Sequence, residues 1–176
     1  IRMMRGTGRV TGEPPENVLK AAEIPKPEPL VDQAHIRGVT ERVDDQGNVV
    51  IGLDENDVRS AIRDIQSKYD LDGIAVSYLW SFRNTDHEKR TREIIREIDD
   101  DLFVSLSHEV APSAGEYERS TATAINSLVG PIISQYLSDI EKSLRDDYGF
   151  NGTFLLMGCN GGALMVDQAI ANPIRL

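Results

Sequence analysis

The sequence predicts an α/β fold in which a mostly parallel sheet is flanked by helices, with an extended N-terminal segment and a β-hairpin in front of it. Three apolar runs have the length of buried strands, and the segments between them are helical in period and long enough to cross over a sheet. We therefore divide the chain into residues 1–53, an irregular connector plus β-hairpin, and residues 54–176, an α/β domain. Because the chain begins with Ile1 rather than Met, we expect it to be a fragment of a larger subunit.

The composition disfavours several classes of protein. With 19 Lys and Arg against 29 Asp and Glu, the net charge is −10, so nucleic-acid phosphates would meet a repulsive field. The single cysteine, Cys159, rules out an intramolecular disulfide framework. No apolar run approaches the roughly 20 residues needed to cross a bilayer, and the start does not resemble a signal peptide. We expect a soluble, cytoplasmic protein that binds neither nucleic acid nor membrane.

Residues 1–35 are expected to be irregular. They hold five of the eight prolines, and the alternating prolines of residues 24–30 favour an extended connector along the surface. Residues 36–53 then alternate between polar and apolar side chains on both sides of a turn-forming segment, residues 44–48. This pattern predicts a β-hairpin.

Helices and strands alternate from residue 54 onward. Asp54 is placed to cap a helix, and the apolar run 74–80 predicts a strand that is buried on both faces. Thr85 and Glu88 have the spacing of a capping box for the next helix, whose many charged residues we interpret as a solvated face. A second buried strand is predicted over residues 102–107.

The longest helix is predicted over residues 117–146. Its apolar rhythm continues in phase on both sides of Pro131, so we expect the proline to bend the helix rather than end it. We expect this helix to be the most buried one, with a buried face made of Ile125, Leu128, Val129, Ile132, Ile133, Tyr136, Leu137 and Ile140. Residues 153–157 predict a third strand of the same sheet, and residues 158–162 a turn into a last short helix.

His108 and Glu109 follow the second strand directly, at the edge of an α/β sheet where ligands bind. His108 is a candidate acid/base or ligand contact. Alternatively, His108 or Glu109 bonds loop backbone and fixes the turn. The pair is not a zinc-protease motif, because no second His follows one helical turn later and Pro112 opposes a helix there.

Glu116 and Arg119 lie in a polar segment, residues 115–121, at the start of the long helix. An i, i+3 ion pair between them is the simpler interpretation. A helix N-terminus that opens beside His108 would also favour an anionic substrate.

Asn160, Gly161 and Gly162 lie at the predicted strand-to-helix turn, where backbone N–H groups can cradle an anion. Turns of this composition also form for steric reasons alone. Cys159 could act as a nucleophile, but no partner His stands at a known spacing, so a buried structural thiol is the simpler interpretation.

Several motifs, taken in order, resemble one protein family. They are residues 73–84, His87-Glu88, residues 107–112, residues 115–119 and Asn160-Gly161-Gly162, together with the hairpin segments 37–44 and 47–50. The succession resembles the hydantoinase A/5-oxoprolinase family, which includes ATP-dependent N-methylhydantoinase, 5-oxoprolinase and the related subunits of acetone and acetophenone carboxylases. The resemblance extends over essentially the whole chain.

The resemblance implies a fragment of a larger subunit with an actin/sugar-kinase-like ATPase fold. The implied cofactors of the parent protein are ATP and Mg²⁺. The family's phosphate-binding segments are absent from this sequence, so we expect neither cofactor on this fragment. The implied partners are a small-molecule substrate and a second subunit of the hydantoinase B type, in an oligomeric parent.

The function implied by the resemblance is ATP-dependent hydrolysis of a cyclic amide, such as N-methylhydantoin or 5-oxoproline. The candidate catalytic residues are His108, Glu109, Glu116 and Arg119. The candidate substrate- or phosphate-binding residues are Asn160, Gly161 and Gly162, and no metal ligand is assigned. The alternative is a non-catalytic scaffold or subunit-interface module of an acetone/acetophenone carboxylase-type complex. The residues leave open whether the substrate is a cyclic amide or a ketone.

Overall fold

The computed structural model describes residues 14–18 and 29–176, and the chain divides after Ile36 into two units. The first unit contains helix α1 (Pro15–Val18) and the 3-10 turn η2 (Gln33–His35). The second unit begins at Arg37 and includes the hairpin. The division expected from the sequence, at residue 53, instead groups the hairpin with the N-terminal connector. Most of that predicted connector, residues 24–28, lies outside the described residues.

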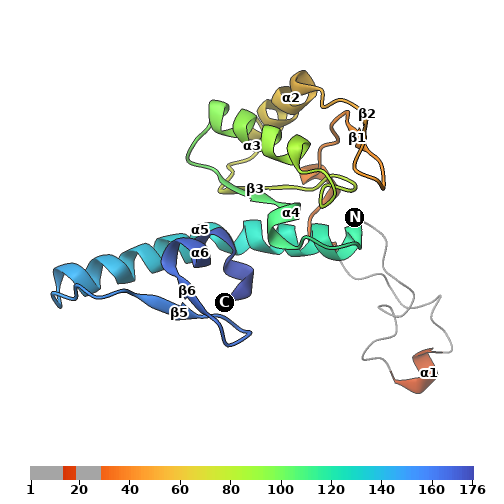
Figure 1. The fold of residues 1–176 in the computed structure, drawn as a ribbon. Coiled ribbons are helices and arrows are strands. Elements are labelled where there is room, and N and C mark those ends of the chain that lie inside the picture. Colours follow the sequence, from red (N-terminus) through yellow and green to blue (C-terminus); the bar gives the residue numbers. More distant parts are fainter. Residues whose placement is uncertain (1–13, 19–28) are drawn as a thin grey trace. The chain divides into compact units, whose positions relative to one another are not determined.

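The second unit has three two-stranded sheets and five α-helices among its described residues (Figure 1). Its elements are, in chain order, β1 (Arg42–Val43), β2 (Val49–Ile51), α2 (Glu55–Gln66), β3 (Gly73–Val76), α3 (Asp86–Ile98), β4 (Phe103–Leu106), α4 (Ser107–Val110), α5 (Glu116–Asp146), β5 (Leu155–Met157), β6 (Ala163–Met165), α6 (Val166–Ala171) and the 3-10 turn η3 (Pro173–Arg175).

The predicted hairpin is confirmed as the antiparallel pair β1–β2. Asp44 organises its turn, since its Oδ1 accepts the backbone N–H groups of Gln46 and Asn48, and Gly47 takes the positive φ of 92° that the turn requires. The Asn48 side chain also donates to Asp44, and these hydrogen bonds lower the pKa of the Asp44 carboxyl.

Strands β3 and β4 are paired in parallel, from Gly73 opposite Phe103 to Val76 opposite Leu106, and helices lie on both sides of the pair (Figure 1). On one side, Val76 and Leu106 join the main apolar core, to which α2 and α3 contribute their buried aliphatic residues. The other side faces α5. The predicted βαβ unit is therefore confirmed for these two strands, since they pair in parallel and α3 connects them along the chain. Alternate residues of each strand reach opposite helical layers.

Helix α5 approaches the strands so closely that two positions tolerate only glycine. A Cβ added at Gly73 would lie 2.7 Å from the carbonyl oxygen of Ser127, and one added at Gly130 would lie 2.2 Å from the ring of Phe103. The Ser127 carbonyl is the one to which Pro131, having no N–H, cannot donate, yet α5 continues through the proline as predicted. Small residues at this contact set the distance between helix and sheet.

The predicted buried face of α5 is only partly confirmed, since Leu137 is buried and Ile133 packs against it as expected, but other members of that face are exposed. Its buried residues are Arg119, Thr123, Asn126, Ser127, Gly130 and Leu137. Of the apolar residues expected inside, Leu128, Ile132 and Tyr136 are 66%, 69% and 59% exposed. Nor is α5 the most buried helix, since it buries six of its 31 residues and α3 buries five of 13. The close contact with β3 and β4 leaves room only for small side chains, so the large ones turn away.

The three-stranded, mostly parallel sheet is also wrong. Residues 155–157 do form a strand, β5, but it pairs antiparallel with β6 rather than joining β3 and β4. Residues 158–162 are the turn of this hairpin, with Gly161 at a φ of 81°, and not a strand-to-helix turn. Leu137 of α5 forms a second small core with Val166 and Ala169 of α6, and Leu156 and Leu164 of the hairpin pack against this core. The short run 163–165 pairs locally because a tight turn brings it beside β5 at low entropic cost.

In the part of the chain that the structure describes, no helix combines the length and apolar character that a membrane span would require.

Candidate functional site

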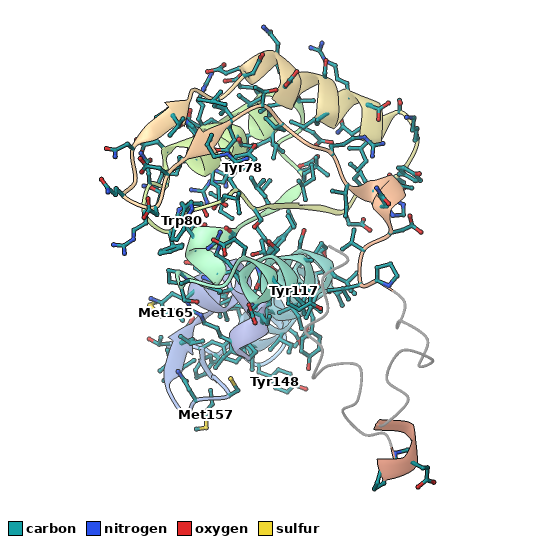
Figure 2. The ribbon with its side chains drawn as sticks, turned by 90° about the vertical axis from the view of Figure 1, so that its right-hand side faces the viewer. Tyr78, Trp80, Tyr117, Tyr148, Met157 and Met165 are labelled. Carbon is teal, nitrogen blue, oxygen red and sulfur yellow. The ribbon has the colours of Figure 1, made fainter. Side chains whose placement is uncertain are left out.

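The candidate site lies where the parallel strands β3 and β4 end. This is the edge of the sheet at which the sequence predicts a site. Three segments meet there: the loop 77–84 after β3, the single turn of helix α4 after β4, and the start of α5. Figure 2 labels Tyr78 and Trp80 in the first of these segments and Tyr117 in the third. The helical turn α4 was not expected and ends at Val110, two residues before Pro112.

Glu88 is the buried acceptor on which the site is built. Its side chain is fully buried, and its Oε1 accepts the backbone N–H of Tyr78 at 3.0 Å and the hydroxyl of Ser107 at 2.6 Å. Its Oε2 accepts the backbone N–H of His108 at 3.0 Å and the Nδ1 of the same residue at 2.7 Å. One carboxylate thereby joins the loop after β3 to the turn after β4.

These hydrogen bonds decide the charge of Glu88. Burial acts to raise the pKa of its carboxyl, but the bonds from the side chain of His108, from Ser107 and from two backbone N–H groups outweigh burial and hold that pKa below its usual 4.5. Glu88 is therefore an ionised carboxylate at neutral pH, surrounded only by donors.

The capping box predicted from Thr85 and Glu88 is not formed. Thr85 makes no side-chain cap, and the side chain of Asn84 accepts the N–H of Asp86 in its place. Glu88 instead points inward from the first turn of α3 to the site. Sequence reasoning missed it because a carboxylate at this spacing in a charge-rich helix is typical of a cap.

Arg119, on the first turns of α5, is enclosed by the site rather than presented to solvent. Its Nε donates to the hydroxyl of Ser107 at 3.1 Å, one terminal nitrogen to the carbonyl of Ser113 at 3.2 Å, and the other to the carbonyl of Tyr78 at 2.8 Å. The guanidinium carbon also lies 5.2 Å from the ring centroid of Phe82. Arg119 thus fastens the loop after β3 to α5 at several points.

Ser107 connects the two buried charges. Its hydroxyl donates to Glu88 and accepts from Arg119, and the hydroxyl of Ser81 lies 2.9 Å away. A serine hydroxyl has one proton and two lone pairs, so these three contacts satisfy it fully. No pattern in the sequence distinguishes Ser107 or Ser81, since isolated serines beside strands are common.

The loop after β3 is bent at Trp80, which has a left-handed φ of 59°. A non-glycine residue in this region costs of order 1–3 kcal/mol and persists only where its surroundings fix it. Here the carbonyl of Trp80 accepts the N–H of Arg83 at 2.8 Å, and its ring lies 5.6 Å from that of Phe82. The bend places Ser81 next to Ser107.

A second hydrogen-bonded chain leads away from the site along α3. The hydroxyl of Tyr78 lies 2.9 Å from the hydroxyl of Thr91, which donates to the carbonyl of His87. His87 in turn pairs through Nδ1 with Glu41 at 2.8 Å. Burial is the main reason that the pKa of Tyr78 rises to about 12, so this phenol stays protonated and serves as a structural donor.

The structure brings four of the predicted residues together. His108 and Arg119 are linked through Glu88 and Ser107, and the Nε2 of His108 lies 3.8 Å from Glu109. The expected i, i+3 ion pair is also present, with 3.8 Å between a terminal nitrogen of Arg119 and Oε1 of Glu116. The Glu116 side chain is half exposed. The main-chain N–H of His108 and its ring bind the same buried carboxylate, which ties the turn after β4 to α3. The acid/base role of His108 stays a prediction.

The predicted residues Asn160, Gly161 and Gly162 lie apart, in the exposed turn between β5 and β6. The N–H groups that could receive an anion already donate within the chain, that of Gly161 to Gly158 and that of Gly162 to the side chain of Asn160. An anion would have to displace these bonds. Cys159 in the same turn is exposed, contrary to the buried thiol expected.

Solved structures show the same fold in longer proteins. A nucleotide-free structure of acetone carboxylase, an enzyme of ATP-dependent acetone carboxylation, matches 93% of this chain with a TM-score of 0.77 and 28% identity. The ATP-dependent caprolactamase of Pseudomonas jessenii matches 74% with a TM-score of 0.68 and 30% identity. The matches occupy 24% and 19% of those chains.

Comparison of sequences also finds relatives that are longer than this chain. The uncharacterized protein MJ0964 of Methanocaldococcus jannaschii is 36% identical over 148 residues, which are 84% of this chain and 22% of that protein. The acetophenone carboxylase gamma subunit of Aromatoleum aromaticum is 38% identical over 143 residues, 78% of this chain and 19% of that subunit. The chain thus spans about a fifth of the length of these relatives.

Residues 6–99 match the family described as the hydantoinase/oxoprolinase N-terminal region. The match includes the hairpin, α2, β3 and α3, and with them Glu88. Because it covers more than half of the 176 residues, the chain belongs to the hydantoinase/oxoprolinase family.

Proposed function

We propose that this chain is part of an enzyme subunit that hydrolyses a cyclic amide with consumption of ATP, and that His108 transfers protons in that reaction. The observation that carries the proposal is the pair formed by Glu88 and His108 at the edge of the sheet. A buried carboxylate holds one ring nitrogen at 2.7 Å, while the other ring nitrogen lies beside the half-exposed Glu109. Such a pair is suited to general acid–base catalysis.

The chemistry of amide hydrolysis explains why such a group is needed. The attacking water must lose a proton, and the departing amide nitrogen must gain one. A single imidazole can take the first proton and return it in the second step. The substrate class is supported by the caprolactamase relative, whose name refers to a cyclic amide.

The nucleotide enters this proposal only through the rest of the subunit. Among the described residues, 14–18 and 29–176, no group of three His, Cys, Asp or Glu side chains could hold a metal ion. The N–H groups of the turn 158–162 are largely engaged within the chain. These residues do not fit a Mg²⁺–nucleotide site, so we propose that ATP and Mg²⁺ bind to other parts of a family subunit and derive no step through them.

The test uses a family subunit of full length that carries this sequence. His108→Gln should lower the turnover of a cyclic amide by about 10²–10⁴-fold, because proton transfer is lost. The melting temperature shows whether the variant is still folded. His35→Gln, a histidine outside the site, is the matched control and should retain turnover. Wild-type turnover in the His108 variant would reject the proposal.

A second candidate function is a scaffold or subunit-interface module in a carboxylase-type complex. It is favoured by exposed apolar side chains, namely Leu128, Ile132 and Tyr136 on α5 and Leu155, Met157 and Met165 on the hairpin β5–β6. Figure 2 shows Met157 and Met165 on the outer side of that hairpin. The proposed partner is a second subunit of the hydantoinase B type. Replacing Met157 and Met165 by Thr should then abolish co-purification with that subunit, whereas unchanged assembly would contradict this function.

A further inference from the structure

We propose that Glu88 is a positioning residue that fixes the tautomer of His108. Nδ1 then carries the ring proton, and Nε2 presents a lone pair, so that His108 begins the reaction as a proton acceptor. This inference rests on the proposed proton-transfer role of His108 and names the direction of the first transfer.

The first step of the argument concerns the acceptor. An ionised carboxylate can only accept hydrogen bonds, so the Nδ1 atom 2.7 Å from Oε2 of Glu88 must be protonated. The remaining neighbours of Glu88 agree with its ionised state. Tyr78, Ser107 and the backbone of His108 all direct a proton at it.

The second step concerns orientation. Oε2 of Glu88 binds both the backbone N–H and the ring of His108, so that residue is held at two points. The His108 side chain is 8% exposed and the Glu88 side chain 0%, which leaves the ring little freedom to turn over. A 180° turn of the ring would place Cδ2–H against the carboxylate and lose the bond from Nδ1.

The third step concerns Nε2. Its neighbour, Oε1 of Glu109, lies 3.8 Å away, which is too far for a hydrogen bond. The other oxygen of Glu109 binds Arg92 at 2.8 Å, which draws this carboxylate toward α3. Glu88 therefore holds the inner nitrogen, and no comparable bond from Glu109 holds the outer one.

Arg119 completes the arrangement through Ser107. Because Arg119 donates to the Ser107 hydroxyl, the Ser107 proton is left to point at Glu88. The positive charge of Arg119 is thus connected to the negative charge of Glu88 by one hydroxyl. This supports an ionised Glu88 both before and after His108 is charged.

The proton balance of the step is simple. Nε2 takes a proton from the attacking water, whose oxygen forms the new bond to the amide carbon, and the ring becomes an imidazolium beside Glu88. The proton then passes to the amide nitrogen as the carbon–nitrogen bond breaks. The proton transfer itself requires no oxidant or reductant.

The tautomer is directly measurable on the 176-residue chain by long-range ¹H–¹⁵N spectroscopy of its three histidines. His108 is assigned by the signal lost in His108→Gln. The pH is raised until the ring nitrogen shifts no longer change, so that the neutral ring is observed. We expect Nδ1–H in the wild type.

Two matched variants separate the neighbouring carboxylates. Glu88→Gln should lose the uniform Nδ1–H state and show Nε2–H, whereas Glu109→Gln should retain Nδ1–H. A wild-type ring in the Nε2–H form would overturn the inference, even if Glu88→Gln fails to fold. An unchanged tautomer in folded Glu88→Gln, or a changed one in Glu109→Gln, would overturn it equally.

Turnover in a full-length subunit gives the second readout. Glu88→Gln should lower kcat at least about 10²-fold with KM little changed, because a misplaced tautomer affects the proton transfer and not substrate binding. If the spectra show Nδ1–H but His108→Gln is fully active, the proposed function fails and the positioning of the ring stands. If His108→Gln is inactive but the ring is Nε2–H, the positioning fails and the proposed function stands.

Discussion

At the scale of single residues, the site is organised by two buried charges that do not touch each other. Glu88 and Arg119 are both fully buried, and Ser107 stands between them. A buried charge without partners is very costly, and here each is surrounded by hydrogen bonds of the matching kind. These hydrogen bonds offset the cost of burial and hold the loop after β3, the turn α4 and the start of α5 around the two charges.

Glu88→Gln should change the acid dependence of stability. The pKa of Glu88 is lower in the folded chain than its usual 4.5, so the unfolded chain takes up the proton first. The stabilisation from Glu88 is therefore present above that value and is lost as the pH falls through the lower folded pKa. At neutral pH the variant should be about 1–3 kcal/mol less stable, because buried donors lose their acceptor.

Urea unfolding across the acid range measures this effect. The difference in unfolding free energy between wild type and Glu88→Gln should shrink as the pH falls through and below 4.5. A difference that stays constant over the whole range would mean that Glu88 is not a low-pKa carboxylate in the folded chain.

Arg119→Lys should be strongly destabilising despite conserving charge. Lysine cannot reproduce the planar fork that reaches Ser107, Ser113 and Tyr78, so about 2–4 kcal/mol of unfolding free energy should be lost. The matched control on the same helix is Arg145→Lys, where the side chain is 67% exposed and pairs with Glu141. That change should stay within about 0.5 kcal/mol, measured by urea unfolding.

At the scale of elements, the packing of α5 on β3 and β4 overrides its apolar pattern. Helix and strands approach through glycines and small polar side chains, as with Asn126, whose amide donates to Ser105 of β4. Large aliphatic residues at the same face would separate the layers. The apolar stripe of the helix consequently reaches a core farther along, where Ile133 and Leu137 join the second cluster.

Gly130→Ala separates helix propensity from packing. Alanine is favoured over glycine by about 1 kcal/mol in a helix interior, so propensity alone predicts stabilisation. Because the new Cβ would lie 2.2 Å from the Phe103 ring, we expect a net loss instead, seen as a lower melting temperature. Gly38→Ala, where the added Cβ would meet no atom within 4 Å beyond its chain neighbours, is the control and should be nearly neutral or slightly stabilising.

A pair of truncations tests the corrected face of α5. Leu137 is 2% exposed and Ile132 is 69% exposed. Leu137→Ala should cost about 2–5 kcal/mol and Ile132→Ala no more than about 0.5 kcal/mol, measured by urea unfolding. Equal losses would restore the face expected from the periodicity.

At the scale of the whole molecule, the described residues of the second unit form two separate apolar clusters. One is the core between β3–β4 and the helices α2 and α3, and the other joins the hairpin β5–β6, α6 and Leu137. The outer face of that hairpin carries exposed Leu155, Met157 and Met165. An apolar surface of this kind is typical of a protein interface.

The 176-residue chain alone should show no tight ATP binding and no ATPase activity above background. The expectation follows from the absence of the family's phosphate-binding segments and from a turn at 158–162 whose N–H groups are largely engaged. Isothermal calorimetry with Mg²⁺ and ATP is the measurement. A micromolar, Mg²⁺-dependent site on this chain would contradict it.

The sequence alone determined the local elements and the edge of the sheet where the site lies. Periodicity and turn residues predicted the hairpin β1–β2, the helices α2, α3 and α5 and the pairing of β3 with β4, and His108 followed from its place after a strand. These features depend on contacts between residues near in sequence or on the right-handed crossover, for which few alternatives exist.

Only the tertiary structure decided the rest. Glu88 lies 20 residues from His108 in sequence, and nothing local distinguishes a capping carboxylate from one that turns inward to bind a distant imidazole. The same holds for the third strand, which pairs with its neighbour rather than with the sheet, and for α5, whose buried face is set by the steric fit of Gly73 and Gly130. Side-chain direction and close approach are properties of pairs of elements, and periodicity within one element does not contain them.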